Sequence, residues 1–99
     1  MLHIVNKSPL ERASFASCLR VAPPDSAILL IEDGVYAATR DTEAAAQIGR
    51  HAKSMRFYAL GPDLEARGVR DRVVEGVQVV DYEGFVDLVA AHENVQSWL

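Results

Sequence analysis

Short apolar segments recur along the chain, and each has the length and composition of a buried β-strand. The clearest is the run Ala-Ile-Leu-Leu-Ile at residues 27–31. Continuous apolar runs of this length, without polar alternation, are typical of strands in a parallel sheet that is covered on both faces. The predicted strands span residues 2–6, 26–31, 55–60 and 77–80, and the tail at 94–99 is predicted as either a further edge strand or a docking segment.

The first helix is predicted directly after the first strand. Residues 8–11 read Ser-Pro-Leu-Glu. The serine hydroxyl can cap a helix, the proline suits the first helical position, and the glutamate can reach back to the cap. The prolines at positions 23 and 24 end this helix, because proline cannot continue one. The predicted helix carries Cys18, which is the one cysteine of the chain.

Further helices are predicted after the later strands. Asp41 or Thr42 can cap one helix and Asp81 can cap the last, and two shorter helical segments are predicted at residues 35–39 and 64–67. Strands that alternate with helices form parallel sheets whose crossovers cover both faces. We therefore predict an α/β fold, a three-layer α/β/α domain over residues 1–99 with a small, mainly parallel sheet of four or five strands.

Composition and charge narrow the class of protein. The net charge is −4, and no run of Lys and Arg forms a basic stripe, which argues against direct nucleic-acid binding. No apolar run approaches the ~20 residues of a membrane span, and the start of the chain lacks the pattern of a secretory leader. A lone cysteine cannot form an internal disulfide, which suits a reducing compartment. We expect a cytoplasmic protein with no membrane contact and no direct nucleic-acid partner.

Parallel sheets place their ligand sites in the loops at the carboxyl ends of the strands. In this chain those loops contain no glycine-rich dinucleotide fingerprint, no Walker loop and no nucleophile elbow. His3, His51 and His92 are far apart in sequence and show no metal-ligand spacing. We therefore expect neither a cofactor nor a metal site.

Two features remain as candidate chemistry. Glu32 and Asp33 are adjacent carboxylates at the end of the second predicted strand. They could do acid–base work if burial separated their pKa values, but the favoured interpretation is a turn in which Asp33 bonds local backbone. Cys18 shares a helix face with Phe15 and Leu19, which predicts a buried thiol, whereas small neighbours could leave the sulfur reachable. The residue pattern leaves both alternatives open for Cys18.

Five blocks of sequence, in order and spread over the whole chain, carry a family resemblance. They are residues 1–9 (Met-Leu-His-Ile-Val-Asn-Lys-Ser-Pro), 31–38 (Ile-Glu-Asp-Gly-Val-Tyr-Ala-Ala), 58–68 (Tyr-Ala-Leu-Gly-Pro-Asp-Leu-Glu-Ala-Arg-Gly), 80–88 (Val-Asp-Tyr-Glu-Gly-Phe-Val-Asp-Leu) and 95–99 (Val-Gln-Ser-Trp-Leu). These blocks resemble the DsrH/TusB family. The resemblance implies a DsrE-like fold and a subunit of a cytoplasmic sulfur relay. It also implies assembly with DsrE/TusD-like and DsrF/TusC-like paralogues into a heterohexamer that passes persulfide sulfur to a DsrC/TusE-like carrier.

Two biological contexts go with this resemblance. Dsr-type complexes serve dissimilatory sulfur oxidation, and Tus-type complexes feed thiolation of the wobble uridine of certain tRNAs. Cys18 matches the first-helix cysteine of DsrH-type members, and residues 6–9, 61–63 and 98–99 also look more like DsrH. We therefore expect the Dsr context, with the Tus context as the alternative.

The resemblance also bears on the role of the cysteine. It implies that the principal sulfur-carrying cysteine lies on the DsrE/TusD-like paralogue, so Cys18 is expected to be an auxiliary persulfide carrier that accepts sulfur slowly. One alternative is a purely structural, non-catalytic subunit in which Cys18 belongs to the core. Another is an independent small-ligand domain with a site at residues 32–34.

Overall fold

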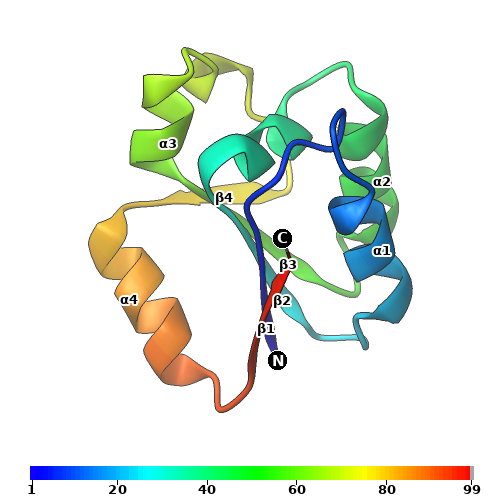
Figure 1. Ribbon diagram of the computed structural model, residues 1–99, viewed down its shortest axis with the longest axis vertical. Coiled ribbons are helices and arrows are strands. Elements are labelled where there is room, and N and C mark those ends of the chain that lie inside the picture. The colour runs from blue at the N-terminus through cyan, green and yellow to red at the C-terminus, as the bar shows by residue number, and fades with distance from the viewer. Residues whose placement is uncertain (99) are drawn as a thin grey trace.

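A parallel sheet of five strands lies at the centre of the computed structural model, which describes residues 1–98 (Figure 1). Leu99, the last residue of the family-like ending, lies outside the described residues. The strand order is β4-β3-β2-β1-β5, and every neighbouring pair is parallel. The strands are β1 (Leu2–Val5), β2 (Ala27–Leu30), β3 (Arg56–Leu60), β4 (Val77–Val80) and β5 (Val95–Trp98).

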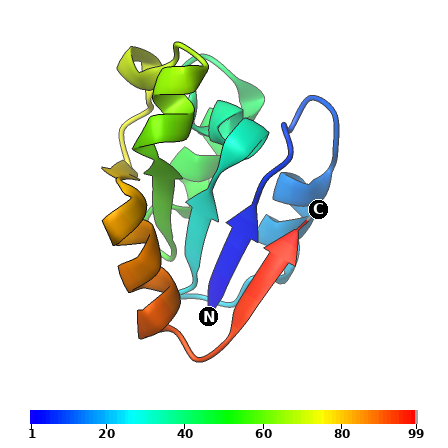
Figure 2. The same ribbon diagram turned by 60° about the vertical axis from the view of Figure 1, so that its left-hand side comes forward.

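Helices cover both faces of this sheet, as Figures 1 and 2 show. α1 and α2 pack on one face and α4 packs on the other, while α3 and the 3-10 helix η1 lie at the carboxyl ends of the strands. The helices are α1 (Ser14–Val21), η1 (Glu32–Ala38), α2 (Glu43–His51), α3 (Gly61–Ala66), the short 3-10 turn η2 (Arg70–Arg72) and α4 (Tyr82–Ala91). The predicted α/β class with its parallel sheet is confirmed, and the tail forms the fifth strand. No helix in residues 1–98 is long and apolar enough to cross a membrane.

The two faces of the sheet are buried to different extents. Alternate residues of β1 and β2 point to opposite faces, because side chains alternate along a strand. On the face covered by α1 and α2, a large cluster of buried side chains surrounds Val5, Phe15, Cys18 and Ile28. On the α4 face, the fully buried residues are Leu2, Ala27 and Leu29, and the side chains of α4 that pack against them are only partly buried. The α4 face is therefore the less completely covered of the two.

Two of the predicted helix caps are present. The Thr42 hydroxyl accepts a hydrogen bond from the backbone N–H of Ala45 at 3.1 Å, which settles the choice between Asp41 and Thr42. The Asp81 carboxylate accepts one from the backbone N–H of Gly84 at 2.8 Å. Each bond satisfies one of the donors that the first turn of a helix leaves without a partner.

The predicted start of the first helix is wrong. The Ser8 hydroxyl accepts a bond from the N–H of Leu10, only two residues ahead, and the Ser8 carbonyl accepts from Glu11 and Arg12 at 3.0 Å each. These bonds close a turn at the end of β1. The helix begins at Ser14, and its cap residue, Ala13, makes no side-chain cap bond. The Ser-Pro-Leu-Glu pattern is compatible with a turn because a serine hydroxyl bonds nearby backbone in both structures.

Candidate functional site

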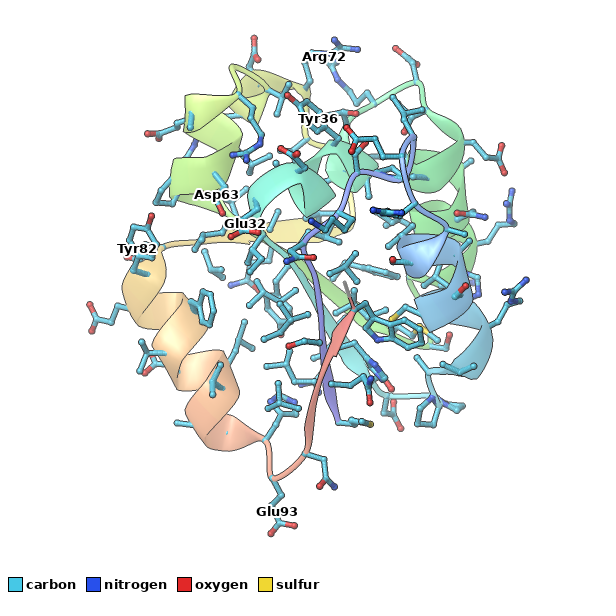
Figure 3. All side chains as sticks on the ribbon, in the orientation of Figure 1. Glu32, Tyr36, Asp63, Arg72, Tyr82 and Glu93 are labelled. Carbon is cyan, nitrogen blue, oxygen red and sulfur yellow. The ribbon has the colours of Figure 1, made fainter. Side chains whose placement is uncertain are left out.

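A hydrogen bond joins η1 to α3 at the carboxyl end of the sheet. The Asp63 carboxylate, in the first turn of α3, accepts a hydrogen bond from the backbone N–H of Glu32 at 2.7 Å. Figure 3 shows Glu32 and Asp63 next to each other between η1 and α3. Glu32 has a φ of +49°, in the left-handed region that residues with a Cβ rarely adopt. The hydrogen bond that Asp63 accepts therefore stabilises an unfavourable backbone conformation at the end of β2.

Asp33 does not bond the local backbone, so the turn interpretation is wrong in that detail. Its carboxylate pairs with the Arg67 guanidinium at 2.9 Å, and Arg67 also donates to the Asp63 carbonyl at 3.2 Å. The turn itself is closed by the N–H of Gly34 bonding to the carbonyl of Ile31. The two acids of the loop are thus not brought together for acid–base work. Asp33 helps to attach η1 to α3.

Gly34 shows how tightly η1 packs against the end of β1. A Cβ atom built at this position would lie 2.1 Å from the carbonyl oxygen of Val5. A side chain cannot fit there without moving backbone, so glycine is needed for the close approach. The space on this side of Gly34 is occupied by the backbone at the end of β1.

Cys18 lies in the middle of α1 and is fully buried, with 0% of its surface exposed. It packs in the same cluster as Phe15 and Leu19, which agrees with the helix face that the sequence predicts. Burial raises the pKa of the Cys18 thiol to about 12, because a thiolate loses its hydration in an apolar environment. The nearby Arg20 donates to the Ser17 hydroxyl at 3.2 Å. The persulfide-carrier role of Cys18 stays a prediction, and it would require the thiol to become accessible.

A buried histidine that the sequence did not single out lies on the same face of the sheet as the α1 cluster. His3 is 3% exposed, and its Nδ1 accepts a hydrogen bond from the Trp98 indole at 3.1 Å. This bond places the ring proton on Nε2, which is buried and has no partner. Burial lowers the pKa of His3, and the Met1 ammonium lowers it further. The only available signal was strand alternation, which places His3 on the same face as Val5.

The other two histidines bond their own helices. His51 Nδ1 lies 2.9 Å from the carbonyl of Gln47, and His92 Nδ1 lies 2.8 Å from that of Leu88. Within residues 1–98, no three His, Cys, Asp or Glu side chains come together in a way that could hold a metal ion.

The strand order, with helices on both faces, defines a class of small α/β proteins that includes solved structures. A protein of unknown function from Methanobacterium thermoautotrophicum superposes with a TM-score of 0.75 and 21% identity, over 97% of this chain and 95% of that one. The ychN protein from Escherichia coli superposes with a TM-score of 0.73 and 14% identity, over 98% and 97% of the two chains. At these identities the likeness establishes the fold alone.

Sequence comparison identifies the family. The family described as "DsrH like protein" matches residues 7–95. Protein TusB of Pectobacterium parmentieri is 33% identical over 98 residues, and Protein TusB of Escherichia coli O1:K1 is 36% identical over 98 residues. Each alignment covers 99% of this chain and 100% of the relative. The chain belongs to the DsrH/TusB family.

Proposed function

We propose that this chain is a subunit of a sulfur-relay complex that supplies sulfur for thiolation of the wobble uridine of certain tRNAs. The observation that carries the proposal is the alignment with two TusB proteins over their whole length, at 33% and 36% identity. This observation favours the Tus context over the Dsr context that the sequence pattern led us to expect. In the proposed complex the partners are TusD-like and TusC-like paralogues in a heterohexamer, and the acceptor is a TusE-like carrier in the cytoplasm.

Within this complex, the chain contributes to assembly more than to sulfur chemistry. Sulfur transfer needs a thiolate that can reach a persulfide sulfur. With the pKa of Cys18 raised to about 12, roughly one thiol in 10⁵ is ionised at neutral pH, and the buried side chain has no exposed surface. The family resemblance implies that the principal carrier cysteine lies on the TusD-like partner, and the burial of Cys18 supports this division of roles. Cys18 acts as an auxiliary acceptor only when α1 opens locally.

The Dsr context is retained as a second candidate because of one feature. Cys18 lies on the first helix, α1. It matches the first-helix cysteine of the DsrH-type members that the chain resembles. In that case the same complex would serve dissimilatory sulfur oxidation, with a DsrC-like carrier.

A gene deletion in the source organism tests the proposal and separates the two contexts. Nucleosides from total tRNA are analysed by mass spectrometry before and after deletion, and after the gene is restored. The proposal expects 2-thiolated wobble uridine to fall and to recover on complementation. Unchanged thiolation together with impaired sulfur oxidation would favour the Dsr context. If both are unchanged, the chain does not act in a sulfur relay.

A further inference from the structure

α4 carries a second apolar side that does not face the sheet. Phe85 and Leu88 pack against the sheet, whereas Tyr82, Val86 and Val89 are 61%, 65% and 37% exposed. Residues four and three apart lie on the same side of a helix, so these exposed side chains form one continuous stripe. An amphipathic helix of a protein that works alone would place polar residues there.

The edge strand on this side of the sheet is also exposed. In Figure 2, β5 lies at the edge of the sheet with no helix in front of it, while α4 lies on the other side of β1 from β5. Val95 pairs with Leu2 in the parallel register, so its side chain points to the α4 face, and it is 41% exposed. The stripe on α4 and Val95 are thus exposed apolar side chains on the same side of the sheet, and we call them together the α4–β5 surface (Tyr82, Val86, Val89 and Val95).

Charge is distributed very unevenly with respect to this surface. Residues 73–99 contain no Lys or Arg, whereas residues 1–72 carry ten basic and nine acidic residues. The acids of the C-terminal stretch are Glu75, Asp81, Glu83, Asp87 and Glu93, all of them exposed. In Figure 3, Glu93 lies just beyond the end of α4 that is opposite Tyr82. Apolar side chains on α4 are therefore bordered by negative charge.

One basic side chain near the start of α4 is already paired. Arg70 lines a cavity with Asp81 and Gly84, but its guanidinium pairs with Glu65 at 2.8 Å. The pair with Glu65 reduces what Arg70 can contribute to neutralising the acids of α4.

We propose that the α4–β5 surface docks a partner protein whose apolar contact surface is bordered by Lys and Arg. The apolar stripe supplies burial, and the acidic border supplies attraction and orientation. A second copy of this chain is disfavoured because two such surfaces would bring like charges together. Anionic lipid and nucleic acid are repelled for the same reason. The inference rests on the proposed function for the identity of the partner, which is one of the two paralogous subunits.

The test uses two matched substitutions. Val86→Asp places a charge in the stripe on α4, and Val21→Asp does the same at the end of α1, where Val21 is 62% exposed against 65% for Val86. Both valines are exposed helical residues outside the buried clusters, so both variants should keep the fold, which circular dichroism checks. Binding to the purified TusD-like and TusC-like subunits is measured by calorimetry and by sedimentation. Val86→Asp is expected to weaken binding by about 30-fold, the effect of losing a central interface residue, while Val21→Asp leaves it within about twofold.

The charged border is tested separately. Asp87→Lys changes an exposed side chain without touching the apolar packing, so it remains informative if Val86→Asp fails to fold. The expected result is slower association with the paralogues, and wild-type association that slows as salt is added. An unchanged association rate of Asp87→Lys with the paralogues would overturn the role of the acidic border in docking.

The outcomes separate the two proposals. If the wild-type chain binds the paralogues and Val86→Asp binds equally well, the α4–β5 surface is wrong while the proposed function stands. If Val21→Asp alone loses binding, the partner docks on the α1 face, which also overturns the inference. If the isolated chain forms a dimer that Val86→Asp breaks, the occupant is a second copy. Failure of the wild-type chain to bind either paralogue would contradict the proposed function and the inference with it.

Discussion

The indole of Trp98 donates a hydrogen bond to Nδ1 of His3 at 3.1 Å, which joins the last strand of the sheet to the first. The centroids of the two rings are 6.1 Å apart, and the ring planes make an angle of 40°. β5 is otherwise an exposed edge strand, since Val95, Gln96 and Ser97 are all exposed. Trp98 therefore attaches β5 to the core, through this bond and through its packing against the buried cluster.

The His3 pair makes stability depend on pH in a defined direction. Burial holds the pKa of His3 below its ordinary value of 6.5, with a further contribution from the Met1 ammonium. Below about pH 6.5 the unfolded chain therefore binds a proton that the folded chain does not, and folding loses stability as the pH falls toward the lowered pKa. Above about pH 6.5 His3 is neutral in both the folded and the unfolded chain, so it causes no loss of stability there. Urea unfolding of wild type and His3→Gln across this range should show a smaller acid-side loss in the variant. Equal losses in the two proteins would contradict the assignment.

Replacing Trp98 by Phe tests the attachment of β5. An aromatic ring is kept, although a smaller one, while the donor is lost and the buried Nδ1 of His3 is left without a partner. We expect a loss of about 1–2 kcal/mol in the free energy of unfolding. Relative to the wild type, hydrogen exchange should accelerate more in β5 than in β2. Tyr82→Phe is the control, because Tyr82 is 61% exposed. Similar effects from both substitutions would mean that the indole bond contributes nothing specific.

The two acids around η1 should differ sharply in their effect on stability. Asp63→Ala removes the acceptor for the Glu32 N–H, where the backbone is already strained, and should cost about 1–2 kcal/mol. Asp33→Ala removes a half-exposed ion pair with Arg67 and should cost no more than about 0.5 kcal/mol. Denaturant unfolding of the two variants gives the comparison. A larger loss in Asp33→Ala would contradict the roles assigned here.

The burial of Cys18 predicts slow modification by thiol reagents. Because the thiol is 0% exposed and burial raises its pKa to about 12, iodoacetamide should label the folded chain at least ~10³-fold more slowly than the unfolded chain. Labelling should accelerate as urea is added. Equally rapid labelling of the folded and unfolded chains would show that α1 leaves the sulfur reachable, and would favour a direct chemical role.

Local patterns were sufficient to predict four of the five strands and the helix caps at Thr42 and Asp81. The apolar run at residues 27–31 is a strand because it is covered on both faces, and Ala27 to Leu30 are all fully buried. Thr42 and Asp81 cap helices because their oxygen atoms bond to N–H groups only three residues ahead. Interactions of this range are encoded within a few residues of sequence.

The contacts between residues far apart in the sequence could not be predicted in the same way. Asp33 meets Arg67 across 34 residues, and His3 meets Trp98 across 95. Such pairs depend on which strands become neighbours, and the sequence pattern left the role of the tail open. Local patterns can also mislead. The Ser8 hydroxyl accepts a bond from nearby backbone, as predicted, but this bond belongs to a turn and not to a helix.

We propose that this chain serves a sulfur relay through assembly, with Cys18 as an auxiliary site at most. The most direct test is sulfur transfer to the TusE-like carrier by the reconstituted three-subunit complex, followed by mass spectrometry of each cysteine peptide after a persulfide donor is added. A complex that contains Cys18→Ala should retain most of the transfer, and a mixture that lacks this chain should lose it. Abolished transfer in Cys18→Ala, or full transfer without the chain, would contradict the claim.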